Sequence, residues 1–366
     1  MTDTPASAPM NEDGGVDSTS AQSLALIDVS PLLADFDPTG PAALAVASQI
    51  DSACRSLGFF RVTGHGIDHA LFRRLDVTSR EFFALPDADK SQYSMVNAGA
   101  AWRGWFPVRG EITSGQPDRK EGLYVGIDHA PGHPRVRNKT PLHGANLFPP
   151  GALGPAVDDW LAAVRPVADA VMRGMALGLG LEHDWFERHL TDDPTILFRI
   201  FHYPALPDND TADESGVGEH TDYGLITLLA QDDRGGLEVR APDGRWLPVP
   251  GEPTTFVCNL GDMLDRLTEG RYRSTPHRVR NTSGKSRLSF PYFFDPSWDA
   301  KVPALPLAGS APADDASRRW DGTSVHAWEG TYGEYLTAKV ARVFPTLFAD
   351  LVAEPAVEER ATSGEG

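Results

Sequence analysis

The chain has 366 residues, with 51 acidic and 33 basic side chains, and so a formal net charge of −18. This excess of negative charge argues against a nucleic-acid partner, because a phosphate backbone would repel such a surface. The length suits one β-barrel surrounded by helices, and we find no apolar segment long enough to span a bilayer.

The two cysteines and the terminal segments indicate a cytoplasmic protein. Cys54 and Cys258 are far apart and match no metal-ligand spacing, so we expect two buried thiols and no disulfide. Residues 1–22 lack the basic start and apolar run of a signal peptide. Residues 1–22 and 354–366 are polar, and we expect both to be disordered tails. A monomer is the expected oligomeric state.

We expect residues 23–155 to form an N-terminal region that covers a pocket. The pattern predicts a strand at 24–30, a helix at 41–58 that Gly58 ends, a strand at 59–66 and a helix at 69–85. The stretch 97–155 is rich in Gly, Pro and aromatic residues. We expect loops and short strands there, covering the pocket.

Residues 156–353 are predicted to hold a long helix followed by the catalytic core. After the helix at 157–180, which contains Pro166, the hydrophobic period changes to two. Many short strands separated by turn signals, among them Asp243-Gly244, predict a sandwich or jelly roll. The expected strands are 196–203, 224–231, 236–240, 245–250, 254–261, 276–280 and 287–294, and a helix at 331–344 closes the core.

The segment GEHTDYGL contains the pattern that bears most directly on function. His220 and Asp222 are two residues apart, so on a strand both side chains would project from one face and could bind one ion. His277 follows in STPHRVR, on a strand that the fold would have to bring alongside. Two imidazoles and one carboxylate leave the opposite side of a metal open, which is the facial triad of non-haem Fe(II) oxygenases. These three residues are the predicted metal ligands and catalytic centre.

A second pair of residues two apart, Arg287 and Ser289, lies in RLSF. Arginine presents a planar fork that matches a carboxylate, and a hydroxyl on the same strand face can donate to the same group. The pair therefore predicts a carboxylate-binding site.

Longer segments resemble the isopenicillin N synthase-like group of Fe(II)- and 2-oxoglutarate-dependent oxygenases. They are GEHTDYGLITLLAQDDRGGLEVR, NLGDMLDRLTEGRYRSTPHRV, RLSFPYFF, GFFRVTGHGID and RGWFPVRGEITSGQPDRKEGLYVG. The likeness is greatest to bacterial members, among them the ethylene-forming enzyme. The resemblance implies a mixed α and β fold, namely a double-stranded β-helix (jelly roll) with flanking helices.

The resemblance also implies cofactors and the residues that hold them. Fe(II) would be bound by the three ligands above, and Arg287 and Ser289 would hold the distal carboxylate of 2-oxoglutarate, which reacts with O₂. In FRIFHYP, Tyr203 matches a tyrosine that helps hold the co-substrate, and Arg199 matches an arginine near its 1-carboxylate.

The expected substrate is a small organic molecule, such as an amino acid derivative or a secondary metabolite. Glu111 and Thr113 match positions that touch an amino-acid substrate in the related ethylene-forming enzyme. The other predicted substrate residues are aromatic or basic: Trp102, Arg103, Trp105, Phe106 and Phe294. Hydroxylation is the default reaction, and desaturation or cyclisation would use the same residues.

Two alternatives stay open on sequence. Isopenicillin N synthase and plant aminocyclopropane carboxylate oxidase share the triad and the Arg-x-Ser pair without using 2-oxoglutarate. A jelly-roll binding protein without catalysis is the other alternative. A zinc hydrolase is disfavoured because the His-Glu-x-x-His pattern is absent.

Overall fold

The computed structural model describes residues 23–205, 216–305, 307, 316, 319 and 322–345. The tails expected at 1–22 and 354–366 lie outside the described residues, as does the end of the expected region 156–353. Among the residues that are described, no helix is both long and apolar enough to cross a membrane.

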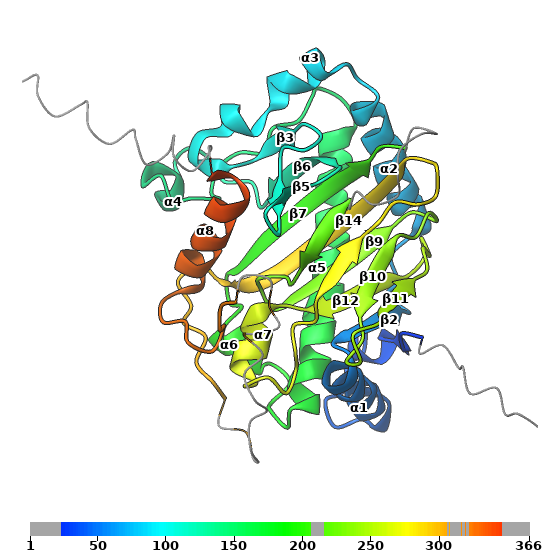
Figure 1. Cartoon of the computed structure of the whole chain (residues 1–366). Helices are drawn as coiled ribbons and strands as arrows, with labels where there is room; N and C mark the ends of the chain where they lie inside the picture. The colour runs from blue at the N-terminus through cyan, green and yellow to red at the C-terminus, as the bar shows by residue number, and fades with distance from the viewer. Residues whose placement is uncertain are drawn as a thin grey trace, which may run out of the picture.

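Two sheets face each other in the described part of the chain (Figure 1). We call the sheet of eight strands the major sheet and the sheet of four strands the minor sheet. The order in the major sheet is β1 (Leu26–Asp28), β2 (Phe59–Thr63), β12 (Phe256–Leu260), β9 (Ile226–Gln231), β14 (Arg287–Ser297), β7 (Pro194–Tyr203), β6 (Glu121–Gly126) and β3 (Gly104–Phe106). The order in the minor sheet is β11 (Trp246–Val249), β10 (Leu237–Arg240), β13 (His277–Val279) and β8 (Val217–His220).

Two strands outside these sheets, β4 (Ile112–Thr113) and β5 (Gln116–Pro117), form a small ribbon. Pairing is antiparallel within the major and minor sheets, except that β1 runs parallel to β2. This is the double-stranded β-helix that the resemblance predicts.

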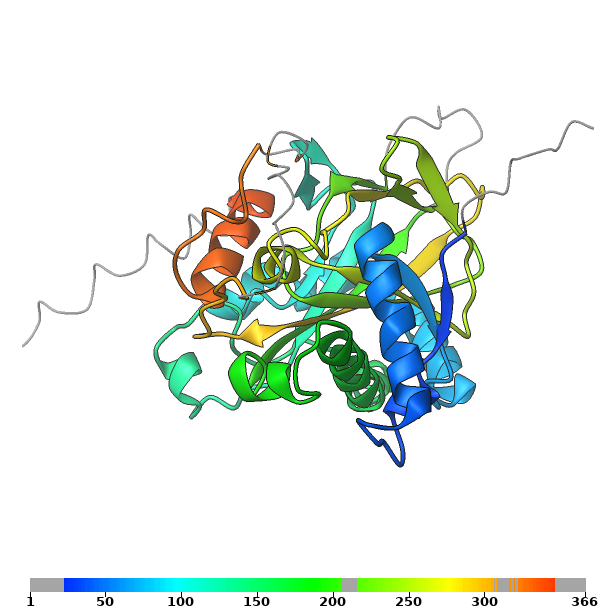
Figure 2. The same cartoon turned by 90° about the horizontal axis from the view of Figure 1, so that it is seen from below.

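Three helices cover the face of the major sheet that is turned away from the minor sheet (Figure 2). The central one, α5 (Leu153–Gly178), contacts β14 and the helices α1 (Pro41–Ser56) and α2 (His69–Phe83). The sequence explains where the flanking helices begin and end. Proline occupies the first turn of α1, Gly58 follows that helix with φ of 68°, and the Asp68 side chain caps α2.

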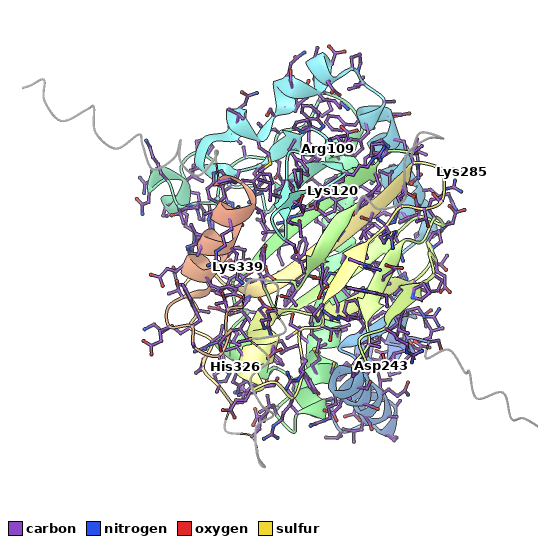
Figure 3. All side chains as sticks on the ribbon, viewed as in Figure 1. Arg109, Lys120, Asp243, Lys285, His326 and Lys339 are labelled. Carbon is purple, nitrogen blue, oxygen red and sulfur yellow. The ribbon has the colours of Figure 1, made fainter. Side chains whose placement is uncertain are left out.

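The last described helix, α8 (Tyr332–Val343), lies at one edge of the sheets, where Figure 3 labels Lys339. A reciprocal capping box between Thr331 and Glu334 fixes its start. The remaining helical turns are short: η1 (Ser30–Leu32), α3 (Asp87–Lys90), η2 (Ser91–Tyr93), η3 (Met95–Ala101), α4 (Pro134–Arg137), α6 (Trp185–His189) and α7 (Asp262–Leu267).

The expected helices and strands are found close to their predicted bounds, and the differences include the following. Helix α5 begins at Leu153, before the predicted residue 157, and contains Pro166 as predicted. Helix α7 was not predicted, because its six residues are too short to show a helical period. The expectation that His220 and Asp222 share one strand is wrong, since β8 ends at His220.

Side chains of β14 point alternately into a cavity between the sheets and toward α5, and this alternation decides which of them can belong to the site. Arg287, Ser289, Pro291, Phe293 and Asp295 line a cavity between the sheets. The intervening residues are buried on the other face, toward α5: Leu288, Phe290, Tyr292 and Phe294.

Candidate active site and metal centre

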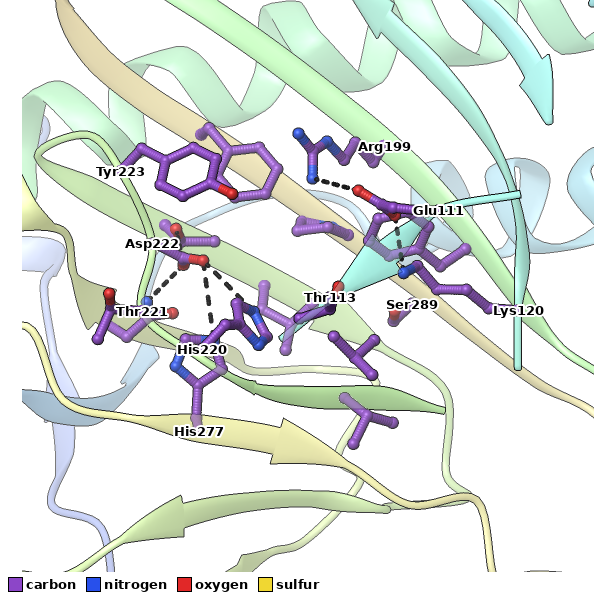
Figure 4. Close-up of a pocket in the computed structure, with 18 of the residues that line it drawn as sticks. Glu111, Thr113, Lys120, Arg199, His220, Thr221, Asp222, Tyr223, His277 and Ser289 are labelled. Atoms are coloured by element: carbon purple, nitrogen blue, oxygen red, sulfur yellow. Dashed lines mark hydrogen bonds and ion pairs between the residues drawn. The ribbon is translucent and has the colours of Figure 1, made fainter. Parts of the chain in front are cut away.

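The three predicted metal ligands come together at one end of the minor sheet (Figure 4). His277 on β13 pairs directly with His220 at the end of β8, and their ring centroids are 4.3 Å apart. Asp222 follows β8 in an isolated parallel bridge with Gly261, and its backbone oxygen accepts from Asp262 N at 2.8 Å. One ligand atom from each of the three side chains lies within 4.8 Å of the others.

Hydrogen bonds turn both imidazoles toward a common point. His220 Nδ1 donates to the Gly218 carbonyl at 2.8 Å, and His277 Nδ1 donates to the Thr275 carbonyl at 3.1 Å. A carbonyl can only accept, so each Nε2 is left as the unprotonated nitrogen. The two Nε2 atoms both lie 3.8 Å from Asp222 Oδ1, a spacing at which one metal ion could be bound by all three atoms.

The carboxylate of Asp222 is oriented in the same way. Its Oδ2 accepts from Thr227 Oγ1 and from Asn259 Nδ2, the latter at 2.6 Å, so Oδ1 is left to face the imidazoles. Burial alone would raise the pKa of Asp222, but the two imidazoles and these hydrogen bonds hold it below its ordinary value. Burial also lowers the pKa of His220, and that of His277 to about 4. The site therefore presents two neutral imidazoles and one carboxylate, the protonation states that a divalent metal requires.

Arg287 and Ser289 lie together deeper in the same cavity. Arg287 is fully buried; its Nε donates to the Gly235 carbonyl at 2.5 Å and its Nη2 to Gln231 Oε1 at 2.9 Å. Its Nη1 is also buried and has no hydrogen-bond partner among the described residues. The Tyr203 ring lies 4.7 Å from the guanidinium, and Ser289 Oγ donates to Tyr203 Oη at 3.5 Å. An unpaired guanidinium nitrogen beside two hydroxyls fits a carboxylate.

A network of buried charges forms another part of the cavity wall. Lys120 Nζ lies 2.7 Å from Glu111 Oε2 and also pairs with Asp118. Thr113 Oγ1 donates to Asp118 Oδ2 at 2.6 Å, and Tyr124 Oη donates to Glu111 Oε1. Burial would raise the pKa of Glu111, but Lys120 and a second cation, Arg199, lower it below its ordinary value. Glu111 is therefore a carboxylate whose oxygens are already engaged.

The cavity encloses about 1010 Å³, counted to the solvent at its mouth, and includes nine of the predicted site residues. They are His220, Asp222, His277, Arg287, Ser289, Tyr203, Arg199, Glu111 and Thr113. His202, between Arg199 and Tyr203 on β7, faces the other way and bonds to Glu121.

The structure places the other predicted substrate residues outside this cavity. Arg103 donates to the carbonyls of Ile127 and Leu142 and to Asn146, so its guanidinium is used to tie loops together. Trp102 lines a separate small pocket beside Arg103.

The three remaining predicted aromatic residues are held by packing. Trp105 Nε1 donates to Glu121 Oε2 at 2.8 Å, and Phe106 packs edge-on against Tyr124 at 5.3 Å. The Phe294 ring lies beneath Arg165 of α5, on the outer face of the sheet.

Several cavity residues were missed by the sequence interpretation. The same alternation that relates Arg287 to Ser289 would have selected Phe293 and Asp295 and rejected Phe294. The ligand-positioning residues Thr227 and Asn259 lie on β9 and β12, and no spacing in the sequence marks them. Tyr223, Lys120 and the α8 residues Leu336 and Val343 also line the cavity.

Fold and site together define a non-haem iron oxygenase built on a double-stranded β-helix. Residues 194–296 match the 2OG-Fe(II) oxygenase superfamily, and residues 24–151 match the N-terminal region described as non-haem dioxygenase in morphine synthesis. The chain belongs to the 2OG-Fe(II) oxygenase superfamily.

Individual relatives cover nearly the whole chain. A probable iron/ascorbate oxidoreductase of Dictyostelium discoideum is 44% identical, over 82% of this chain and 90% of its own. A homoarginine-6-hydroxylase of Glycine max is 36% identical, over 91% of this chain and 99% of its own. Among solved structures, a full-length Neurospora crassa protein in complex with alpha-KG is 27% identical with a TM-score of 0.70, covering 91% of this chain and 98% of that one.

The protein is accordingly a 2-oxoglutarate-dependent Fe(II) dioxygenase that acts on a small-molecule substrate. Its cofactors are Fe(II), for which His220, Asp222 and His277 form the binding triad, and 2-oxoglutarate. The residues fit both groups: three ligand atoms converge from one side, and a buried arginine nitrogen in the same cavity lacks a partner among the described residues.

Proposed function

We propose that this enzyme hydroxylates a C–H bond of a small organic molecule, an amino acid derivative or a secondary metabolite. In the balanced reaction, the substrate, O₂ and 2-oxoglutarate give the hydroxylated product, succinate and CO₂. The observation that supports this most is that the metal triad and the unpaired Arg287 Nη1 line one cavity. The soybean relative is named as a hydroxylase, which favours hydroxylation over desaturation or cyclisation.

Arg287 and Ser289 are the proposed anchor of the distal carboxylate of 2-oxoglutarate, with Tyr203 beside them. Arg287 is already fixed by Gly235 and Gln231, so little side-chain entropy is lost when the carboxylate binds. The guanidinium carbon lies 4.7 Å from the centre of the Tyr203 ring, and this cation–π contact helps to hold the arginine in place. The anchor thereby sets how far the keto-acid end of the co-substrate reaches toward the metal ligands.

Fe(II) with 2-oxoglutarate supplies the chemistry that activates O₂. The chain contributes position, electrostatics and the exclusion of water. Hydrogen bonds to Gly218, Thr275 and Asn259 fix the three ligands in place. The apolar walls, among them Phe293 and Leu336, keep the substrate carbon in a dry environment.

Glu111 and Thr113 are proposed to act on the substrate side of the cavity, in agreement with the resemblance. Thr113 holds Asp118, and Asp118 and Glu111 both hold Lys120. Their proposed part is to position the lysine ammonium on the cavity wall. We also propose that the protein is closely related to the bacterial members of the family. We expect it to be a monomer in the cytoplasm, and the free thiols of Cys54 and Cys258 agree with a reducing compartment.

The first test is spectroscopic. Fe(II) followed by 2-oxoglutarate is added to the metal-free protein without oxygen, and we expect a visible metal-to-ligand charge-transfer band. Arg287→Ala should lose the band at the same co-substrate concentration, whereas Arg165→Ala, which alters an arginine outside the cavity, should keep it. If iron binds to the wild type and no band forms, the anchor holds another group and the oxidase alternative is favoured.

The products provide the second test. Mass spectrometry of substrate oxidised under ¹⁸O₂ should show one added labelled oxygen atom. Loss of two hydrogens without added oxygen would instead indicate desaturation or ring closure.

A further inference from the structure

The guanidinium of Arg199 lines the active-site cavity (Figure 4) and contacts two aromatic rings. Its carbon Cζ lies 4.1 Å from the ring centre of Tyr124 and 4.9 Å from that of Phe293. Cation–π contacts of this kind do not use the N–H groups of the guanidinium, which stay available for hydrogen bonds in its plane. The side chain is only 13% exposed, so water is a limited partner for those N–H groups.

Within the described residues, the Arg199 side chain makes no hydrogen bond, and its Nε is buried without a partner. The nearest carboxylate oxygen, Glu111 Oε1, is 3.7 Å from Nη1, which is beyond hydrogen-bonding distance. Glu111 already accepts from Tyr124 and pairs with Lys120 at 2.7 Å. A buried guanidinium with unsatisfied donors that face a ligand cavity indicates a missing anionic partner.

The two ends of 2-oxoglutarate have binding groups elsewhere. In the proposed function, its distal carboxylate is assigned to Arg287 and its keto-acid end to the metal. The resemblance implied instead that Arg199 lies near the 1-carboxylate of the co-substrate, and the 2-oxoglutarate titration below distinguishes that position from a substrate site. Tyr203 is opposite Arg287 in the pairing of β7 with β14, whereas Arg199 is four residues earlier on β7. Four residues correspond to about 13 Å along a strand, so Arg199 and Arg287 bind at separate points of the cavity wall.

We propose that Arg199 binds a carboxylate of the primary substrate, and that the substrates of this enzyme are therefore small organic acids. The inference rests on the proposed function, because it assigns Arg287 to the co-substrate. The in-plane edge of the guanidinium matches the two oxygens of a carboxylate. Beyond this anchor, the substrate body packs against Phe293 of β14 and Leu336 and Val343 of α8.

The test uses acids paired with their primary amides, which differ only in the group that Arg199 is proposed to bind. The probes are 3-phenylpropanoate with 3-phenylpropanamide, L-leucine with L-leucinamide and L-lysine with L-lysinamide, extended to a library of such pairs. Binding is measured as a shift of the charge-transfer band of the Fe(II)–2-oxoglutarate protein, and turnover as release of succinate.

For the acids that bind, we expect an affinity about 100-fold higher than that of the corresponding amide, because the carboxylate would make two charge-assisted hydrogen bonds with Arg199. Arg199→Gln should remove this preference and leave the 2-oxoglutarate titration unchanged within about 2-fold. Arg199→Lys, which keeps the buried charge but not the fork, should retain part of the preference. Arg165→Gln is the matched control and should behave like the wild type.

Three results would overturn the inference. Equal binding of acids and amides, or no response to any acid in the library, would mean that the cavity does not select a carboxylate. A weakened 2-oxoglutarate titration in Arg199→Gln would instead place the 1-carboxylate of the co-substrate at Arg199. Failure of the wild type to form the charge-transfer band at all would contradict the proposed function itself, so the two failures are distinguishable.

Discussion

Phe293 and Phe294 are adjacent on β14, yet each ring lies beneath a different arginine on opposite faces of the major sheet. Arg199 lies 4.9 Å from the Phe293 ring inside the cavity, and Arg165 of α5 lies 5.2 Å from the Phe294 ring outside it. Successive side chains of a strand point to opposite faces, so Phe293 lines the cavity whereas the next residue, Phe294, makes a structural contact with α5.

This pair gives the first prediction. Phe294→Ala should cost about 3–5 kcal/mol of unfolding free energy, because Phe294 is fully buried beside α5. Phe293→Ala should cost less stability but lower kcat/KM for the substrate by removing part of the cavity wall and the stacking on Arg199. Urea denaturation and succinate release measure the two effects, and a larger loss of stability in Phe293→Ala would contradict the assignment of faces.

The second prediction concerns the residues that orient Asp222. Asn259→Ala removes a hydrogen bond of 2.6 Å to Asp222 Oδ2, and Fe(II) affinity should fall about 10–100-fold. Asp222→Ala should abolish iron-dependent turnover altogether. Anaerobic Fe(II) titration measures the affinity, with Asn97→Ala, on an exposed turn, as control. Unchanged iron binding in Asn259→Ala would show that Thr227 alone suffices to orient the carboxylate.

The third prediction concerns Gly224, which lies in the loop just after Asp222. A Cβ at this position would be 1.5 Å from Asp295 Oδ1, far inside contact distance, and Asp295 is held by Tyr332. Gly224→Ala should displace the loop and weaken both Fe(II) binding and stability. Gly132→Ala, where an added Cβ meets no atom within 4 Å, is the control.

A double variant separates the clash from other causes. In Gly224→Ala/Asp295→Ala the interfering oxygen is gone, so iron affinity should recover toward that of Asp295→Ala alone. The absence of any recovery would show that the glycine is needed for a reason other than Asp295.

The fourth prediction links Lys120 to pH. Lys120→Met leaves the buried carboxylates of Glu111 and Asp118 without their shared cation, which should cost about 3–5 kcal/mol at neutral pH. In the wild type the lowered pKa of Glu111 contributes stability above the unfolded-state pKa, and this contribution is lost as pH falls through the folded pKa.

Without the lysine, burial dominates and the pKa of Glu111 should lie above its ordinary value. The variant should then regain stability relative to the wild type as pH is lowered from about 7 toward about 5, because protonation removes the unpaired charge. Urea denaturation at several pH values measures the difference. A difference in stability that does not change with pH would show that Glu111 keeps its lowered pKa without Lys120.

Much of the fold was predictable because its signals are local. The change from a 3.6-residue to a 2-residue hydrophobic period marked the helices and most strands, and Gly58 marked the end of α1. Helix α7 lacked any such signal, because its six residues are too short to show a helical period.

The sequence by itself determined the chemistry of the site. The His-x-Asp pair with a later histidine identified the metal triad, and the Arg-x-Ser pair predicted the carboxylate anchor proposed above, because these residue types carry the ligand atoms and the donors that such sites need. Only the tertiary structure decided which groups face the cavity and which are already satisfied. Arg103 and Arg199 are both arginines among aromatic residues, yet the Arg103 side chain is bound to loop carbonyls and the Arg199 side chain makes no hydrogen bond among the described residues. That distinction depends on contacts between segments distant in sequence, and no local pattern encodes them.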